Sequence, residues 1–305
     1  LDQQKEEKSP LFIKIISLIA GFFVNLCFVG FLFITNLIET PEVILIIGLL
    51  LFSITVWLSR KNISETINVA IISFFATGIS LFVYGYMDIN PNIYIEFPLI
   101  LLGVLGVILT KNNIIQFLSF ILIFGSLIVF GYEITSVLFL SIFLIIITFS
   151  CSYLFVYEGT TIIKNTYLKK IYRPLLLSLF LTTIYLASAN APIIYFYQDT
   201  FEYHNLLTHI VNISCAICIL FILIKIQYKF QIANQPKVFL FYLIVTIILY
   251  LISNSTLLLY GILFLLITYY SNNPIPFVIS FLLFLYGLFL FYYDMNLSLL
   301  YKSLL

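Results

Sequence analysis

The densest group of side chains that could do chemistry is the stretch QDTFEYHNLLTH, residues 198–209, which contains both histidines of the chain. Asp199, Glu202, His204 and His209 are ligand types that zinc accepts. However, His204 and His209 are five residues apart, so they do not share a helical face, and the HExxH spacing is absent. We interpret the group as an outer polar cluster, expect no metal and no cofactor, and expect His209 to hydrogen-bond within a helix bundle.

The four cysteines all lie inside apolar runs, and Cys215 and Cys218 form a CxxC pair. Redox and metal-binding CxxC pairs normally lie at a helix start or in a turn, whereas this pair lies within a run. We therefore predict that these cysteines pack in a core. The chain also has no GxGxxG, P-loop or GxSxG motif, so no residue is assigned a catalytic role.

Hydroxyl and amide side chains recur every three or four residues in four apolar runs, residues 11–38, 67–87, 172–195 and 206–228. This spacing puts each set on one helical face, and we expect these faces to point into a bundle because lipid offers no hydrogen-bond partner. They either hold helices together or form a polar path for a solute. The candidate path residues are Asn25, Ser73, Thr77, Ser80, Thr182, Tyr185 and Asn212.

The composition requires a membrane as the environment of these elements. The chain is 63% hydrophobic and 9% charged, whereas a soluble domain carries about 25% charged residues. Polar breaks divide it into runs close to the length of a membrane-spanning helix. We predict an all-α, polytopic bundle, a single transmembrane domain over residues 1–305, with eleven spans. The runs are residues 11–38, 43–58, 67–87, 93–110, 114–130, 134–157, 172–195, 206–228, 238–252, 256–270 and 275–293. Residues 238–270 form either two spans or one re-entrant hairpin.

The distribution of charge predicts the direction of these spans. With residues 1–10 as a cytoplasmic tail and alternating spans, every Lys and Arg except Lys302 falls on the cytoplasmic side, as the positive-inside rule requires. The endings YGYMD, FGYE, YFYQD and FYYD then lie at the outer boundary, where tyrosine is favoured. Asp88 and Glu133 are one out-in-out cycle apart, which hints at a repeat of helix pairs. The net charge of +1 is too small to attract nucleic acid, so we expect no nucleic-acid partner.

Two stretches, SETINVAIISFFATGISLFVYGYMD (64–88) and YYDMNLSLLYKSLL (292–305), resemble a bacterial membrane family known as domain of unknown function 4401. The resemblance implies a bacterial inner-membrane protein and a membrane-anchored partner that bears a GDYxxLxY motif. In that family, Lys-Ser opens a further helix, so the resemblance also implies a twelfth span beyond Leu305. It implies no activity.

These observations favour a non-enzymatic, multi-pass component of a membrane complex, which acts by binding a partner. The alternative is a transporter of a small solute or lipid, with its path along runs 11–38, 67–87, 172–195 and 206–228. A membrane enzyme is a third hypothesis.

Overall fold

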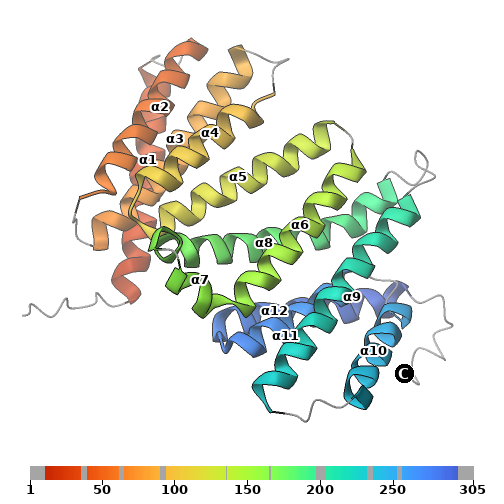
Figure 1. Cartoon of the computed structure of the whole chain (residues 1–305). Helices are drawn as coiled ribbons and strands as arrows, with labels where there is room; N and C mark the ends of the chain where they lie inside the picture. Colours follow the sequence, from red (N-terminus) through yellow and green to blue (C-terminus); the bar gives the residue numbers. More distant parts are fainter. Residues whose placement is uncertain are drawn as a thin grey trace, which may run out of the picture. The chain divides into compact units, whose positions relative to one another are not determined.

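The computed structural model describes residues 11–35, 40–61, 65–89, 94–134, 136–164, 166–196, 204–231, 236–252 and 256–294. These residues form twelve helices and no strand (Figure 1). The chain divides into two compact units, unit 1 over Leu1–Phe130 and unit 2 over Gly131–Leu305.

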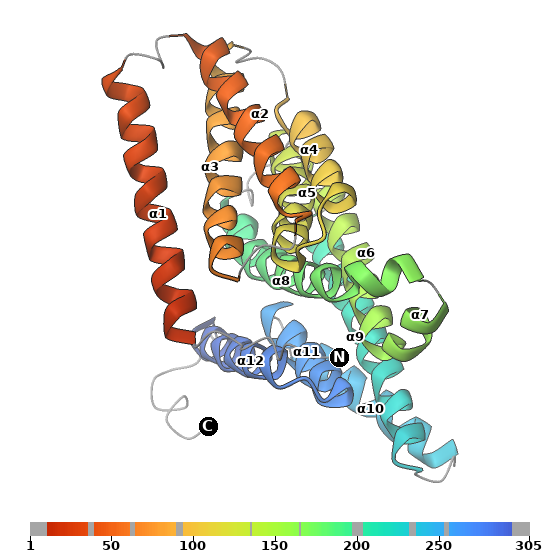
Figure 2. The same cartoon turned by 90° about the vertical axis from the view of Figure 1, so that its left-hand side faces the viewer.

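Unit 1 contains α1 (Leu11–Ile34), α2 (Pro41–Leu58), α3 (Glu65–Ile89), α4 (Glu96–Leu109) and most of α5 (Asn113–Glu133). Helix α3 packs against both α1 and α2 (Figure 2). The core of the unit draws side chains from α2 to α5 and includes Phe52, Phe75, Leu102 and Ile115. The rings of Phe52 and Phe75 lie 5.5 Å apart between centroids.

Unit 2 contains α6 (Val137–Val156), α7 (Glu158–Lys164), α8 (Thr166–Phe196), α9 (His204–Lys229), α10 (Pro236–Ile252), α11 (Thr256–Ser271) and α12 (Pro274–Asp294). Helix α11 contacts α6, α8, α9 and α12, so it lies at the centre of the unit. The first turns of α11 are buried on all sides, since residues 256–261 are all buried. Residues 238–270 contain the two helices α10 and α11, and whether these are two spans or a re-entrant hairpin stays a prediction.

Local signals fix several helix ends. Pro41 occupies the first turn of α2, where its missing N–H leaves no intrahelical bond unmade. Ser136 caps α6 by accepting a hydrogen bond from the backbone N–H of Phe139 at 3.2 Å. Gln231 and Asn272 have φ of 53° and 57°, and these left-handed residues stop α9 and α11.

The helices agree with the predicted all-α bundle, but the prediction of eleven spans is confirmed only in part. Seven described helices are long and apolar enough to cross a membrane: Pro41–Leu58, Ile71–Ile89, Asn113–Glu133, Val137–Val156, Tyr167–Ser188, Leu206–Lys229 and Pro274–Tyr293. Four shorter apolar helices coincide with the remaining runs: Ile19–Leu32, Glu96–Leu109, Pro236–Tyr250 and Thr256–Ser271. Between the runs 134–157 and 172–195, where no helix was expected, the chain forms α7 and the first turns of α8.

Candidate functional site

The candidate path residues of unit 1 differ widely in exposure. Asn25 on α1 is 3% exposed, and neither its amide nitrogen nor its amide oxygen has a hydrogen-bond partner. On α3, Thr77 is half-buried and donates to the carbonyl of Ser73 at 2.9 Å, and the exposed Ser80 donates to the carbonyl of Ala76 at 2.9 Å. The hydroxyls of Thr77 and Ser80 are thus satisfied by their own helix.

The packing face of α3 is not the polar stripe that the spacing predicted. The buried positions are Ile71, Phe75, Gly78, Phe82 and Gly85, which recur at intervals of three and four and face α2. Tyr84, which belongs to the stripe, is 59% exposed. The reason is geometric: glycine lets two helix backbones approach more closely than serine or threonine does.

The candidate path residues of unit 2 lie on α8 and α9. Thr182 is buried and donates to the carbonyl of Ser178 at 2.6 Å, whereas Tyr185 is 55% exposed. Asn212 on α9 is 4% exposed, and its side-chain oxygen has no partner. Four of the seven path residues thus lie in unit 1 and three in unit 2. A path through the protein remains a prediction.

Only part of the outer polar cluster lies within the described residues. Asp199 and Glu202, together with the side chain of His204, lie outside them. His209 is exposed, and its Nδ1 lies 3.1 Å from the hydroxyl of Tyr250 on α10. The expected hydrogen bond of His209 to a neighbouring helix is therefore present. Among the residues that the structure describes, no group of three or more His, Cys, Asp or Glu side chains could hold a metal ion.

The polar contact at the centre of unit 2 was not predicted. Tyr260 on α11 is completely buried, and its hydroxyl lies 3.1 Å from Oγ1 of Thr148 on α6. Thr148 also donates to the carbonyl of Leu144 at 2.7 Å. No signal in the sequence distinguishes Tyr260 from the many tyrosines at helix ends, apart from its place just before Gly261.

The cysteines confirm the packing interpretation with one exception. Cys151, Cys215 and Cys218 are buried free thiols in the core of unit 2, on α6 and α9. Cys27 on α1 is exposed. The CxxC pair therefore lies inside the protein and not at a helix start.

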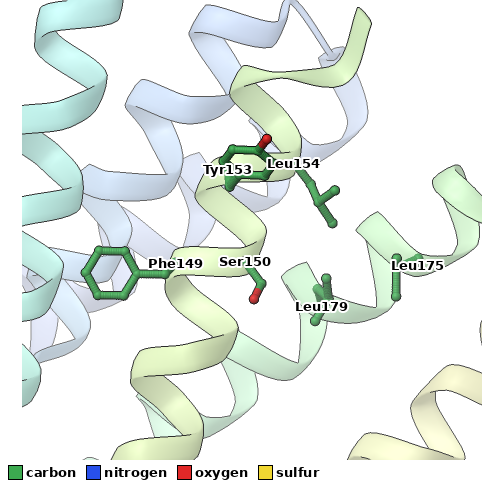
Figure 3. A pocket seen from close by; sticks show the side chains of 6 residues that line it. All are labelled: Phe149, Ser150, Tyr153, Leu154, Leu175 and Leu179. Atoms are coloured by element: carbon green, nitrogen blue, oxygen red, sulfur yellow. The ribbon is translucent and has the colours of Figure 1, made fainter. Parts of the chain in front are cut away.

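Two hollows in the described part of unit 2 are lined mainly by apolar side chains. One, of about 570 Å³, lies between α6 and α8, where Ser150 and Tyr153 supply the only hydroxyls among its lining residues (Figure 3). Phe149, Leu175 and Leu179 also line it. The other, of about 240 Å³, lies between α9 and α10 and ends at Tyr250, the partner of His209. Neither lining contains a charged side chain, so both suit apolar groups.

Basic side chains in each unit meet the ends of neighbouring helices. In unit 1, Nε of Arg60, just after α2, donates to the carbonyl of Leu109 at the end of α4 at 2.7 Å. In unit 2, Nζ of Lys229, at the end of α9, donates to the carbonyl of Tyr270 near the end of α11 at 2.6 Å. Lys225 lies 4.9 Å from the ring centroid of Tyr157, next to the end of α6. Helices that are predicted to run inward thus end together within each unit.

Seven described helices are long and apolar enough to cross a membrane, which is typical of a helical membrane protein. The chain belongs to the family described as Domain of unknown function (DUF4401), whose model matches residues 10–305. No curated protein and no solved structure matches the chain.

Proposed function

We propose that this protein is a multi-pass component of the bacterial inner membrane that has no enzymatic activity and acts by binding a membrane-anchored partner. In this proposal α1 to α6 and α8 to α12 cross the membrane as eleven spans, with the N-terminus in the cytoplasm. The shorter helices α4, α10 and α11 cross where flanking tyrosine and lysine side chains reach the boundary.

The observation that carries the proposal is that core hydroxyls of unit 2 are already bonded within the protein, although the side-chain oxygen of Asn212 has no partner. The hydroxyls of Thr148 and Tyr260 pair with each other, and Ser178 and Thr182 bond to carbonyls of their own helix. A catalytic site instead holds polar groups open toward a cavity. The apolar linings of both hollows fit contact with lipid or with partner side chains.

The test is purification of the tagged full chain in a mild detergent, after co-expression with a membrane-anchored protein that carries a GDYxxLxY sequence. We expect the two chains to elute together at equal molar amounts. The matched control replaces the first tyrosine of that sequence in the partner with alanine, which should separate them. A lone, monodisperse chain in both preparations would contradict the proposal.

A transporter is the second candidate, and the buried amide of Asn25 is the observation that favours it. An amide without a partner inside a membrane protein costs free energy unless a ligand or water satisfies it. If α1 and α3 line a path, Asn25→Leu and Thr77→Val should abolish uptake of neutral radiolabelled solutes by proteoliposomes. Ser53→Ala, at an exposed serine on α2, is the control. Equal uptake by all three variants would exclude this path.

A further inference from the structure

The hairpin α2–α3 is held together by a reciprocal pair of glycines. A Cβ atom added to Gly48 would lie 2.5 Å from the backbone nitrogen of Phe82. A Cβ atom added to Gly85 would lie 2.7 Å from the backbone nitrogen of Leu45. Each glycine therefore faces the residue three positions before the glycine of the other helix, and neither position has room for a side chain.

The hairpin α11–α12 has the same arrangement. A Cβ atom added to Gly261 would lie 2.8 Å from Cα of Phe284, and one added to Gly287 would lie 2.9 Å from Cα of Leu258. Leu258 again precedes its glycine by three positions, and so does Phe284. In both hairpins, the first helix supplies a Leu and a Gly to these contacts, and the second helix supplies a Phe and a Gly.

The sequences around these glycines align without a gap in each helix. FATGISLFVYG, residues 75–85, and FVISFLLFLYG, residues 277–287, are identical at five of eleven positions. LIIGLLLFSIT, residues 45–55, and LLYGILFLLIT, residues 258–268, are also identical at five of eleven. Leucine, isoleucine, phenylalanine and tyrosine are common in this chain, so the two shared glycines, from only 12 in 305 residues, carry most weight in this comparison.

Equivalent positions of the two hairpins also carry similar side chains outside the glycine contacts. Thr55 and Thr268 are each 1% exposed, and each donates to its own helix: Thr55 to the carbonyl of Phe52 at 2.7 Å, and Thr268 to the carbonyls of Phe264 at 2.6 Å and Leu265 at 3.2 Å. Gly78, which packs against α2, corresponds to Ser280, a small residue that is completely buried.

A lysine marks the turn of each hairpin. Trp57 and Tyr270 both follow the first glycine by nine positions. Nζ of Lys61 lies 3.6 Å from the ring centroid of Trp57, and Nζ of Lys229 lies 4.7 Å from that of Tyr270. The second lysine comes from α9 rather than from the hairpin, so it marks the same end of the hairpin but is not part of the repeated sequence.

We propose that α11–α12 is a second copy of the α2–α3 hairpin, inserted in the membrane in the same direction. Lysine favours the cytoplasmic side of a membrane, so both turns lie there. The first helix of each copy runs inward and the second runs outward. Helix α11 therefore crosses the membrane, although it has only 16 residues against 18 in α2. This duplication is independent of any partner.

The first experiment transplants one copy into the other. Replacing residues 277–287 by FATGISLFVYG keeps the register, whereas placing the same segment over residues 278–288 puts tyrosine at the close contact with Leu258 (Gly287→Tyr). We expect the in-register variant to give at least half the wild-type yield of monodisperse protein in detergent, and the shifted variant at least tenfold less. Equal yields from both variants would overturn the duplication.

The second experiment tests direction by labelling single cysteines with a membrane-impermeant maleimide in a Cys27→Ser background. Arg60→Cys and Asn272→Cys, which report the two turns, should both react only in inverted vesicles. Tyr293→Cys, near the end of the second helix of the later copy, should react in intact cells. Reaction of residues 60 and 272 from opposite sides would overturn the shared direction.

Discussion

At the scale of single residues, the pair of Thr148 and Tyr260 shows how a buried hydroxyl is accommodated in an apolar core. Thr148 has two partners, the Tyr260 hydroxyl and the carbonyl of Leu144, so it keeps a hydrogen bond when the tyrosine hydroxyl is removed. The aromatic ring of Tyr260 is completely buried, so packing accounts for more of its contribution than the single hydrogen bond does.

Tyr260→Phe should therefore lower the free energy of unfolding by about 0.5–1.5 kcal/mol, the usual net value of one hydrogen bond. Tyr260→Ala should cost about 3–5 kcal/mol, because it also leaves a cavity. The measurement is reversible unfolding in mixed micelles. Tyr250→Phe, at the partly exposed partner of His209, is the control, and an equal effect of the two phenylalanine variants would contradict this account.

At the scale of helices, capping side chains determine where helices begin and end, while glycines determine which faces pack closely. On α4, a Cβ atom at Gly103 would lie 2.6 Å from Cγ1 of Ile123 and 3.0 Å from the carbonyl oxygen of Ser119, both on α5. Helices α4 and α5 thus approach closely. The start of α6 depends on Ser136, whose hydroxyl caps it.

Ser136→Ala should lower the free energy of unfolding by about 1 kcal/mol, because the backbone N–H of Phe139 loses its acceptor. Ser136→Asn, which restores an acceptor, should recover most of the loss. Thermal unfolding followed by gel filtration in detergent would measure both variants. Identical melting temperatures for the alanine and asparagine variants would show that the cap is not used.

At the scale of the whole molecule, the location of charge agrees with the contacts between helix ends. Within unit 1, α2 and α4 end together at Arg60, and within unit 2, α9 and α11 end together at Lys229. Helices that end together run in the same direction, which alternation of the predicted spans requires. The two contacts agree with the alternation of spans within each unit, and the side on which these ends lie is predicted from the distribution of charge.

Single cysteines at Lys61, just after α2, and at Asp88, near the end of α3, should therefore react with an impermeant maleimide from opposite sides of the membrane. Lys61→Cys is expected to react only after the membrane is opened or inverted, and Asp88→Cys in intact cells. Glu133→Cys, at the end of α5, provides a second outer position. Reaction of positions 61 and 88 in the same compartment would invalidate the eleven spans.

The sequence by itself determined where most of the helices lie, because the length of an apolar run and its flanking charges are local properties, but it did not indicate α7 or the first turns of α8. Only the tertiary structure decided which faces pack. Ser80 and Thr182 each belong to a set of polar residues at helical spacing, yet each hydroxyl donates to a carbonyl of its own helix. The spacing alone therefore does not show whether a polar side chain faces a neighbouring helix. Gly48 and Gly287 carry no polar signal, but their missing Cβ atoms let two backbones touch, and that contact exists only when both helices are in place.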